Sequence, residues 1–296
     1  MRLSAVLVVS CVLGLARAAD AQEFDIVGNW SASLGNYEEV PLRGDPGVEI
    51  GEYVGMPATD AGRLKAQSWM PTLHSLPEWQ GRPHPVTYAM RAPRPDFRLG
   101  TIVAPRTQQI TAYTIQNLFG RADRVIWMDG RPHPSKYAEH KWQGFSTGEW
   151  LPNGVLKVTT THIKQSFMQR NGLPISPYAV MTEFYFRHGE ILTLAIVIDD
   201  PVYLSETFVR TATFRWSPTL AVPPSRGFEV ADELPSLERG EVPAYPLGTR
   251  HPEYAERHHL PQEAAEGGAQ TQYPEYARRL RQLLSDSTAE PEEGRR

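Results

Sequence analysis

The sequence has almost no cysteine: the chain of 296 residues contains one, Cys11. It lies in an apolar run, residues 3–16, that we expect to be removed with a secretory signal peptide. A mature chain without a thiol forms no disulfide, offers no thiolate nucleophile and supplies no cysteine ligand to a metal. The chemistry of the mature protein must then come from other side chains.

The first 21 residues have the features of a signal peptide. Arg2 supplies a positive start, the apolar run follows, and Ala19 and Ala21 form a small-residue cleavage signal before Gln22. The run is too short and wrongly flanked to be a transmembrane segment. Only ten residues precede Cys11 and apolar sequence continues beyond it, which argues against lipid attachment. We therefore predict a periplasmic or secreted protein.

An excess of positive charge is also lacking. The chain has 30 Lys and Arg against 34 Asp and Glu, and removal of residues 1–21 leaves 28 against 33, a change in formal charge from −4 to −5. Without a basic stripe, the chain is a poor candidate for binding nucleic acid. GxSxG, a phosphate-binding glycine loop and a dinucleotide fingerprint are absent as well, so we expect no nucleotide cofactor.

Many segments of the chain have the sequence pattern of a β-strand. Short runs rich in Val, Ile, Thr and aromatic residues alternate with turn signals such as Asn153-Gly154 and His188-Gly189. The expected strands are Ile26–Ser33, Phe97–Val103, Gln109–Ile115, Arg124–Met128, Gly144–Trp150, Val155–Ile163, Val180–Arg187, Ile191–Ile198 and Thr207–Trp216. About nine strands joined by hairpins predict an all-β domain over residues 22–216, an antiparallel up-and-down barrel whose closure removes exposed edges. A two-sheet sandwich is the alternative.

Three further segments are expected around the barrel. Residues 36–94, rich in Gly and Pro, predict a lid over one barrel end with one short helix, Thr59–Ser68. Residues 217–286 predict a Pro-rich linker and a helical tail, because HPEYAERHH and YPEYARRLR each place Pro-Glu at a helix start. The second helix, Pro274–Leu284, has an apolar face that should dock on the body. Residues 287–296 are charged and predicted to be disordered.

Alternation along the strands predicts which side chains point into the barrel. Because charged side chains prefer water, Glu183 and Arg187 mark the outer face of their strand, and His188 then points inward. Lys157 marks the outer face of another strand, which turns His162 inward. Either histidine alone is also explained as a core residue that donates to a backbone carbonyl.

The last strand contributes an inward arginine, Arg210. We expect it to cap the closed end of the barrel by stacking on an aromatic ring, with Trp30 of the first strand as its partner. The candidate substrate-binding residues are Trp127, Phe184, Phe186 and Arg210.

A proline-rich sequence motif occurs twice, as GRPHPVTYA at residues 81–89 and as GRPHPSKYA at residues 130–138. In each copy two prolines flank a histidine, and proline restricts both its own backbone and that of the residue before it. His84 and His133 are therefore held with little conformational freedom left to lose, which suits a ligand or catalytic group. A stiff lid is the alternative explanation. The sequences outside the two copies diverge, which indicates local reuse and not a duplicated domain.

Histidines are expected to gather at the barrel mouth. His133 and His140 follow the fourth expected strand, and with inward His162 and His188 they predict a cluster of three or four imidazoles. These four are candidate ligands for Zn or Cu, because neutral imidazole suits both ions. Without a metal, the same four and Asp129, which could orient one of them, are the candidate acid/base residues. The spacing matches no metal motif, so both possibilities stay open.

Six sequence blocks carry a resemblance to known proteins. They are IWMDGRPHP (126–134), KWQGFSTGEW (141–150), VTTTHIKQSFMQRNGLPIS (158–176), RHGEILT (187–193), DPVYLSETFVR (200–210) and LPQEAAEGGAQTQYPEY (260–276). They resemble an uncharacterised family of secreted bacterial proteins, from which the chain departs at Gly81, where the family has a cysteine. That resemblance implies no activity. Gly28-Asn29-Trp30 resembles the Gly-x-Trp signature of lipocalin-like barrels, and Arg210 resembles the arginine that packs on that tryptophan.

The lipocalin-like resemblance implies an apolar cup that holds a small hydrophobic molecule, and some relatives of that architecture act as isomerases, cyclases or hydratases. Three functions follow. The first is an exported enzyme acting on a small, largely apolar molecule inside the barrel by histidine acid/base or metal-assisted chemistry. The second is a non-catalytic binding or carrier protein for such a ligand, and the third is an interaction or structural envelope protein. Convergence of the four histidines would favour chemistry, whereas scattered imidazoles paired with carbonyls would favour binding.

Overall fold

The structure is a computed structural model. It describes residues 25–32, 49–72, 75–89, 96–116, 123–222, 238 and 240–289. The predicted signal peptide and residues 36–48, 73–74 and 90–94 of the predicted lid lie outside the described residues.

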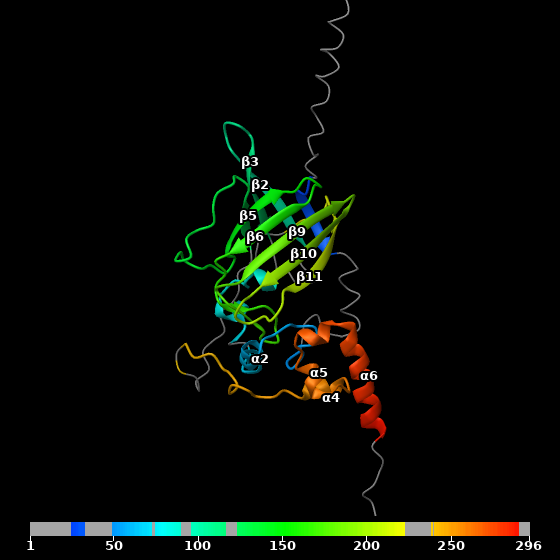
Figure 1. Ribbon diagram of the computed structural model, residues 1–296. Coiled ribbons are helices and arrows are strands. Elements are labelled where there is room, and N and C mark those ends of the chain that lie inside the picture. The colour runs from blue at the N-terminus through cyan, green and yellow to red at the C-terminus, as the bar shows by residue number, and fades with distance from the viewer. Residues whose placement is uncertain are drawn as a thin grey trace, which may run out of the picture.

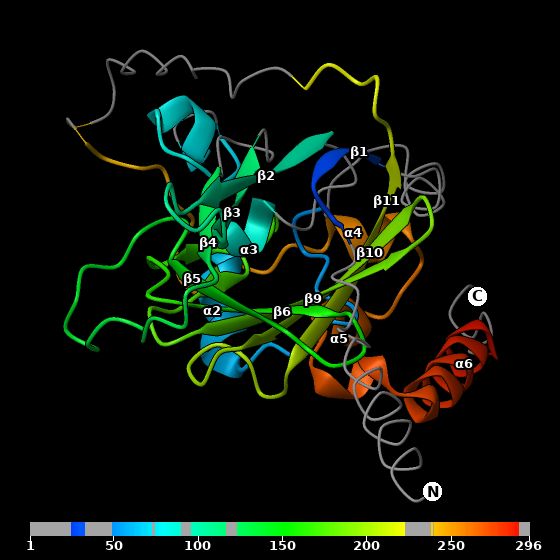
Figure 2. The same cartoon turned by 90° about the horizontal axis from the view of Figure 1, so that it is seen from above.

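Nine strands form a closed barrel (Figure 1). They are β1 (Gly28–Ala32), β2 (Phe97–Val103), β3 (Ile110–Gln116), β4 (Arg124–Trp127), β5 (Phe145–Trp150), β6 (Leu156–Thr161), β9 (Val180–His188), β10 (Ile191–Asp199) and β11 (Phe208–Trp216). Around the barrel their order is β1-β11-β10-β9-β6-β5-β4-β3-β2. The predicted all-β barrel is confirmed, and the sandwich is not formed. Seen from above, the strands surround a common interior (Figure 2).

One pair of neighbouring strands departs from the predicted antiparallel pattern. β4 and β5 are parallel, with Ile126 opposite Ser146, so the barrel is mixed. Parallel neighbours cannot be joined by a tight hairpin, and the chain must travel back along the barrel before β5 begins. Residues 128–144, called the crossover below, make this return and contain the second GRPHP copy.

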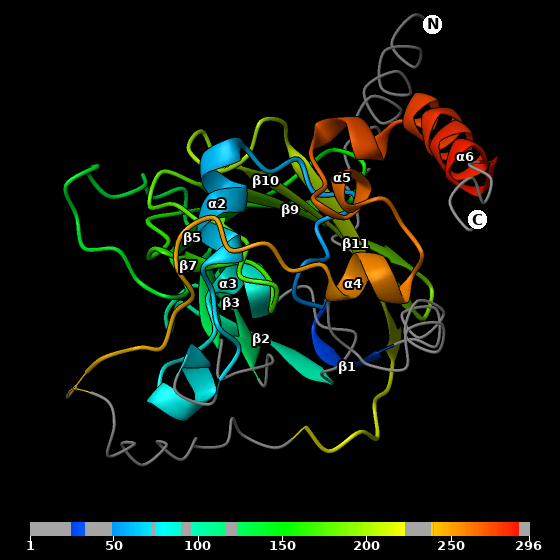
Figure 3. The same ribbon diagram turned by 90° about the horizontal axis from the view of Figure 1, so that it is seen from below.

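Short elements gather at one end of the barrel (Figure 3). They are α2 (Asp60–Gln67), η3 (Pro77–Gln80), α3 (Val86–Ala89), β7 (Ser166–Phe167), β8 (Pro174–Ile175), α4 (Glu253–Arg257), α5 (Gln262–Ala265), η4 (Ala269–Gln272) and α6 (Pro274–Ala289). The predicted N-cap of α2 is confirmed, because the Thr59 side chain accepts a hydrogen bond from Gly62 N. No helix among the described residues is long and apolar enough to cross a membrane.

The tail is tied to the lid region at its beginning and extends away at its end. His251 is buried, and its Nε2 lies 2.8 Å from the carbonyl oxygen of Gln67 at the end of α2. α6 begins at the predicted Pro274 but runs to Ala289, past the predicted end of that helix and into the segment predicted to be disordered. It extends away from the barrel in Figure 1, and Tyr276 is its one buried side chain among those described.

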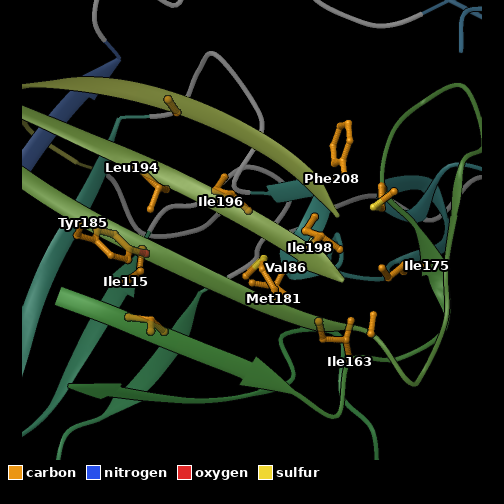
Figure 4. Packing of buried hydrophobic residues seen from close by; sticks show 14 of the residues in the cluster. Val86, Ile115, Ile163, Ile175, Met181, Tyr185, Leu194, Ile196, Ile198 and Phe208 are labelled. Atoms are coloured by element: carbon orange, nitrogen blue, oxygen red, sulfur yellow. The ribbon is translucent and has the colours of Figure 1, made fainter. Parts of the chain in front are cut away.

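Apolar side chains fill the barrel interior (Figure 4). The predicted inward face of β10 is confirmed, and so is that of β6 over Leu156, Val158 and Thr160, since burial alternates along both strands in the expected register. His162, expected on the same inner face, lies beyond the end of β6, and its ring contacts Thr161 and the crossover instead. Inner side chains with no exposed surface are Leu99, Ile115, Ile126, Leu156, Val158, Met181, Tyr185, Leu192 and Leu194. A side chain without accessible surface has no water-sized space beside it. The expected open cup is therefore filled, at these positions, by the protein itself.

The predicted faces of β9 were reversed. Glu183 and Tyr185 are fully buried, whereas Phe186 and His188 are exposed and Phe184 is half-buried on the same outer face. The rule that charges point to water failed because Glu183 meets a buried arginine inside the barrel, and a paired, hydrogen-bonded charge tolerates burial. Phe184 and Phe186 consequently do not line the interior.

Arg187, and not Arg210, covers Trp30. The Cζ atom of Arg187 lies 5.2 Å from the ring centroid of Trp30 and 4.7 Å from that of Trp216. The two indoles meet edge to face with centroids 5.2 Å apart. Arg210 shares the inner face of β11 with Phe208 as predicted, is half-buried, and lies 5.9 Å from the centroid of that ring.

Candidate functional site

A chain of hydrogen bonds joins two of the predicted histidines through threonines. His133 Nε2 lies 2.8 Å from Thr147 Oγ1, and His133 Nδ1 lies 2.7 Å from Thr161 Oγ1. Thr161 Oγ1 also lies 2.8 Å from His162 Nδ1, and His162 Nε2 lies 2.9 Å from the carbonyl oxygen of Ser135. These five residues are called the relay below.

The Ser135 carbonyl sets the direction of every hydrogen bond in the relay. A carbonyl oxygen only accepts, so His162 Nε2 donates and, in the neutral ring, Nδ1 accepts from the Thr161 hydroxyl. Thr161 has then used its proton and accepts from His133 Nδ1, which leaves His133 Nε2 to accept from Thr147. Each side chain between the two ends donates once and accepts once, so two neutral imidazoles are fully bonded.

Strand alternation places the relay on the outer wall of the barrel. Ser146 of β5 and Thr160 of β6 are buried inside, so the residues that follow them, Thr147 and Thr161, point outward. The crossover runs over this wall and brings His133 against the two threonines. The prolines on both sides of His133 restrict the backbone there, as the sequence predicts.

His162 is held in an uncommon backbone conformation. Its φ is 56°, in the left-handed region that residues other than glycine seldom adopt. It follows the last residue of β6, and its carbonyl accepts a 2.9 Å hydrogen bond from the backbone N–H of Lys141 in the crossover. Such strain persists only where neighbouring structure enforces it, and it is concentrated at functional sites.

His140 joins the relay histidines, but His188 does not. The His140 ring packs on that of His162 with centroids 5.2 Å apart, and its Nδ1 lies 3.0 Å from the carbonyl oxygen of Ile163. That nitrogen therefore donates, and in the neutral ring Nε2 keeps its lone pair. Thr160 is opposite the start of β9, while His188 ends that strand, so His162 and His188 lie at opposite ends of the barrel. Three of the four predicted histidines thus gather.

The environment of His133 favours the neutral form of its ring. Partial burial and, second, the neighbouring His162 ring lower the pKa of His133 below its ordinary value of 6.5. The ring is then uncharged over a wider range on the acid side. Uncharged imidazoles are what the relay requires, because only the neutral ring can both donate and accept.

Asp129 and Trp127 both contact Arg131. Asp129 was expected to orient a histidine, and Trp127 to bind a substrate inside the barrel. The Asp129 carboxylate pairs with Arg131 at 2.5 Å, and the hydrogen bond from that arginine lowers the pKa of Asp129. Arg131 also stacks on Trp127, with its Cζ atom 3.6 Å from the ring centroid. The expectation that Asp129 orients an imidazole fails because the adjacent arginine takes its carboxylate.

The histidine cluster does not fit a zinc or copper site. Within the described residues, no group of three or more His, Cys, Asp or Glu side chains could hold a metal ion. Both ring nitrogens of His133 and of His162 already take part in hydrogen bonds, whereas a zinc site needs at least three free protein donors. We therefore derive no step through a metal.

A second polar network, sealed inside the barrel, was missed by the sequence reasoning. Arg124 Nη2 lies 2.5 and 2.6 Å from the two carboxylate oxygens of Glu183 and 3.0 Å from the Tyr185 hydroxyl. Arg124 Nη1 reaches Thr160 Oγ1 at 3.3 Å, and Thr160 bonds Ser146 at 2.8 Å. All five side chains are buried, and they are called the interior cluster below. One signal was available, because Arg124 shares a strand face with apolar Ile126.

The interior cluster is ionic. Burial opposes the charge on Arg124, but the Glu183 carboxylate and the Tyr185 hydroxyl outweigh burial and raise the pKa of Arg124 above its usual range. Burial and then Glu183 raise the pKa of Tyr185, which stays protonated and donates to the carboxylate at 3.1 Å. The cluster is almost completely excluded from solvent, so it can support the barrel but is closed to a substrate.

Comparisons of the chain with protein-family models, with curated proteins and with solved structures find no match. The family resemblance of the sequence blocks stays a prediction, and the function is inferred from the geometry of the relay.

Proposed function

We propose that the chain is an acid–base enzyme that moves a proton on a small, largely apolar molecule at the relay. The observation that carries the proposal is the unbroken line of hydrogen bonds from Thr147 to the carbonyl of Ser135, which has a single direction when both rings are neutral. A line in which every hydroxyl and ring both donates and accepts can pass a proton along its length without leaving a group unpaired.

In the proposed step the substrate gives a proton to the oxygen of Thr147 while the Thr147 hydroxyl gives its own to His133 Nε2. The Nδ1 proton of His133 moves to Thr161, whose hydroxyl proton moves to Nδ1 of His162. The imidazolium formed at His162 keeps its Nε2–H on the Ser135 carbonyl. The reverse sequence returns the proton to a different atom of the substrate, so the net reaction is an isomerisation or, with water, an addition or elimination.

Aromatic side chains near the relay suit a molecule with an apolar body. The Phe145 ring meets the His133 ring edge to face, with centroids 5.4 Å apart. Tyr137, in the same crossover, is 85% exposed, and Trp142 is half-buried two residues beyond His140. The proposed site is therefore on the outer wall under the crossover, and the filled interior gives the carrier hypothesis no comparable support.

The proposal is tested with two probe reactions on the full chain: proton abstraction from 5-nitrobenzisoxazole and hydrolysis of p-nitrophenyl acetate. A positioned general base contributes about 100-fold or more, so the wild-type rate should exceed that of His133→Asn by this factor for at least one probe. Thr161→Val keeps the shape of the side chain but removes the relay hydroxyl, and it should cause a similar loss.

His188→Asn is the matched control, because this histidine is exposed at the other end of the barrel. It should leave both rates unchanged. If wild type and His133→Asn react at the same rate with both probes, the relay is not catalytic and the proposed function is wrong.

A further inference from the structure

The surface around the relay is cationic, although the chain as a whole carries a formal charge of −4. Residues 81–89, 128–144 and 162–164 surround the relay, and together they contain five Lys and Arg against two acidic residues. Arg131 is paired with Asp129. Four cations then remain, Arg82, Lys136, Lys141 and Lys164, and only one acid, Glu139.

Backbone pairing places two of these lysines beside His162. The N–H of Lys141 donates to the carbonyl of His162 at 2.9 Å, and the N–H of Lys164 donates to the carbonyl of Lys141 at 2.9 Å. Both lysines are exposed. The backbones of both lysines are therefore held next to the histidine at which the relay ends.

Two of these cations lie close to the ring of Trp142. The Cζ atom of Arg82 lies 5.9 Å and the Nζ atom of Lys164 lies 5.3 Å from its ring centroid. The side-chain amide of Gln143 donates to the carbonyl of His84 at 2.8 Å, which fixes the first GRPHP copy against the crossover. The two copies thus meet at one place, where the second supplies an imidazole and the first supplies a guanidinium.

These cations have no carboxylate partner in the described part of the chain. None of Arg82, Lys136, Lys141 and Lys164 forms one of the ion pairs found among the described residues. Two of them are steadied by an indole, and two are anchored through their backbone beside His162. Cations gathered on one wall raise the local concentration of anions and favour a ligand of opposite charge.

We propose that the substrate is a small anion with a flat apolar body, bound through its negative group by Lys141 and Lys164 with Trp142 beside the body. This inference rests on the proposed function and narrows it to acidic substrates.

The test measures binding and not turnover. Benzoate, phenyl phosphate and the neutral benzamide are titrated into the full chain while the imidazole and indole NMR signals are followed. We expect both anions to shift the signals of His140, His162 and Trp142, and benzamide at the same concentrations to leave them unchanged. Benzoate affinity should fall about tenfold in Lys164→Gln, the equivalent of one lost charge contact, and should weaken as salt is raised.

Lys157→Gln is the matched control, because Lys157 is on the outer face of β6 but is paired with Glu149. It should not change benzoate affinity. The ratio of the two anion affinities assigns the recognised group as a carboxylate or a phosphate, and either supports the inference.

Equal binding of benzamide and benzoate, absence of binding by both anions, or unchanged benzoate affinity in Lys164→Gln overturns the inference. These outcomes are separate from the rate comparison of wild type with His133→Asn. If the anion site fails and the rate difference stands, the relay acts on a neutral substrate. If benzoate binds and the rates are equal, the anion site stands and the relay is not catalytic.

Discussion

The interior cluster and the relay lie on opposite faces of the same two strands. Ser146 and Thr160 point into the barrel and belong to the cluster, while Thr147 and Thr161, one residue further along each strand, point outward and belong to the relay. The cluster is ionic and buried, whereas the relay consists of hydroxyls, imidazoles and a carbonyl and is part-exposed. The difference shows that full charge is kept here where solvent is excluded and the partners are fixed, whereas the hydroxyls and imidazoles of the relay lie where solvent can reach them.

The largest expected effect comes from breaking the sealed network at Glu183. Glu183→Gln leaves the guanidinium of Arg124 buried without a counter-ion, and removal of one partner of a buried ion pair costs about 3–5 kcal/mol. Urea unfolding of the variant should show this loss. The double variant Arg124→Met with Glu183→Leu removes both charges and should recover most of the stability. A loss below about 1 kcal/mol in Glu183→Gln would contradict an ionic cluster.

The strands could be predicted because their signals are local. Alternation with period two and turn pairs such as Asn153-Gly154 marked the strands correctly, and closure followed from their number. The parallel pairing of β4 with β5 could not be predicted, because a crossover in this chain has no sequence signal that distinguishes it from a long hairpin loop. Pairing of strands depends on contacts between distant segments, which one sequence does not show.

The faces of β9 were wrong for a related reason. Glu183 points inward because of Arg124, which is 59 residues away in the sequence. A local rule that turns charges outward fails wherever two such charges meet inside. On β6, where no buried charge intervenes, the same rule assigned the inner side chains correctly.

The two GRPHP copies show how far a local sequence determines its environment. Tyr88 of the first copy is 2% exposed in α3, whereas Tyr137 of the second is 85% exposed in the crossover. The prolines restrict the backbone of both copies, but the surrounding segments decide what each side chain contacts. The sequence therefore pointed to His133 as a rigidly held imidazole, while its threonine partners came only from the barrel.

Arg187 is less buried than the interior cluster. It is on the inner face of β9 but at the end of the barrel. Its guanidinium covers both Trp30 and Trp216. A partly desolvated cation over aromatic rings contributes about 2 kcal/mol, so Arg187→Ala should lower the free energy of unfolding by roughly that amount. Arg215→Ala, an exposed change on β11, should stay within about 0.5 kcal/mol. Equal losses would show that the stack is not stabilising.

A smaller effect on stability is expected from glycine and alanine substitutions, and its sign should differ between His162 in the relay and Thr160 in the regular strand beside it. At His162, with φ of 56°, the glycine variant should be more stable than the alanine variant by about 1 kcal/mol, because alanine retains the steric cost of the left-handed conformation. At Thr160, in regular strand, the order should reverse, because glycine is the weaker strand residue. Chemical denaturation of the four variants gives both differences. An alanine variant at His162 that is as stable as the glycine variant would mean that His162 is not strained.

Acid should weaken the relay before it reaches the interior cluster. The pKa of His133 is lowered on folding, so between that value and the ordinary 6.5 the unfolded chain binds more protons, and stability falls as the pH falls through this window. Unfolding of wild type and His133→Asn, measured from pH 7 to pH 5, should show a smaller loss in the variant. Identical pH dependence would place His133 outside the groups that titrate on unfolding.

The smallest effect is expected for an ion pair on the outer face of the strands that hold both networks. Lys157 and Glu149 face each other across β6 and β5, with Nζ 2.9 Å from Oε1, a separation close to that in the interior cluster. The pair is reached by solvent, however, and an exposed pair contributes about 0.2–1 kcal/mol. Lys157→Gln should therefore lower the free energy of unfolding by less than about 1 kcal/mol, and by less still in high salt. If this loss approached that of Glu183→Gln, burial would not be what distinguishes the two networks, and the division between a sealed support and an open chemical site would have to be abandoned.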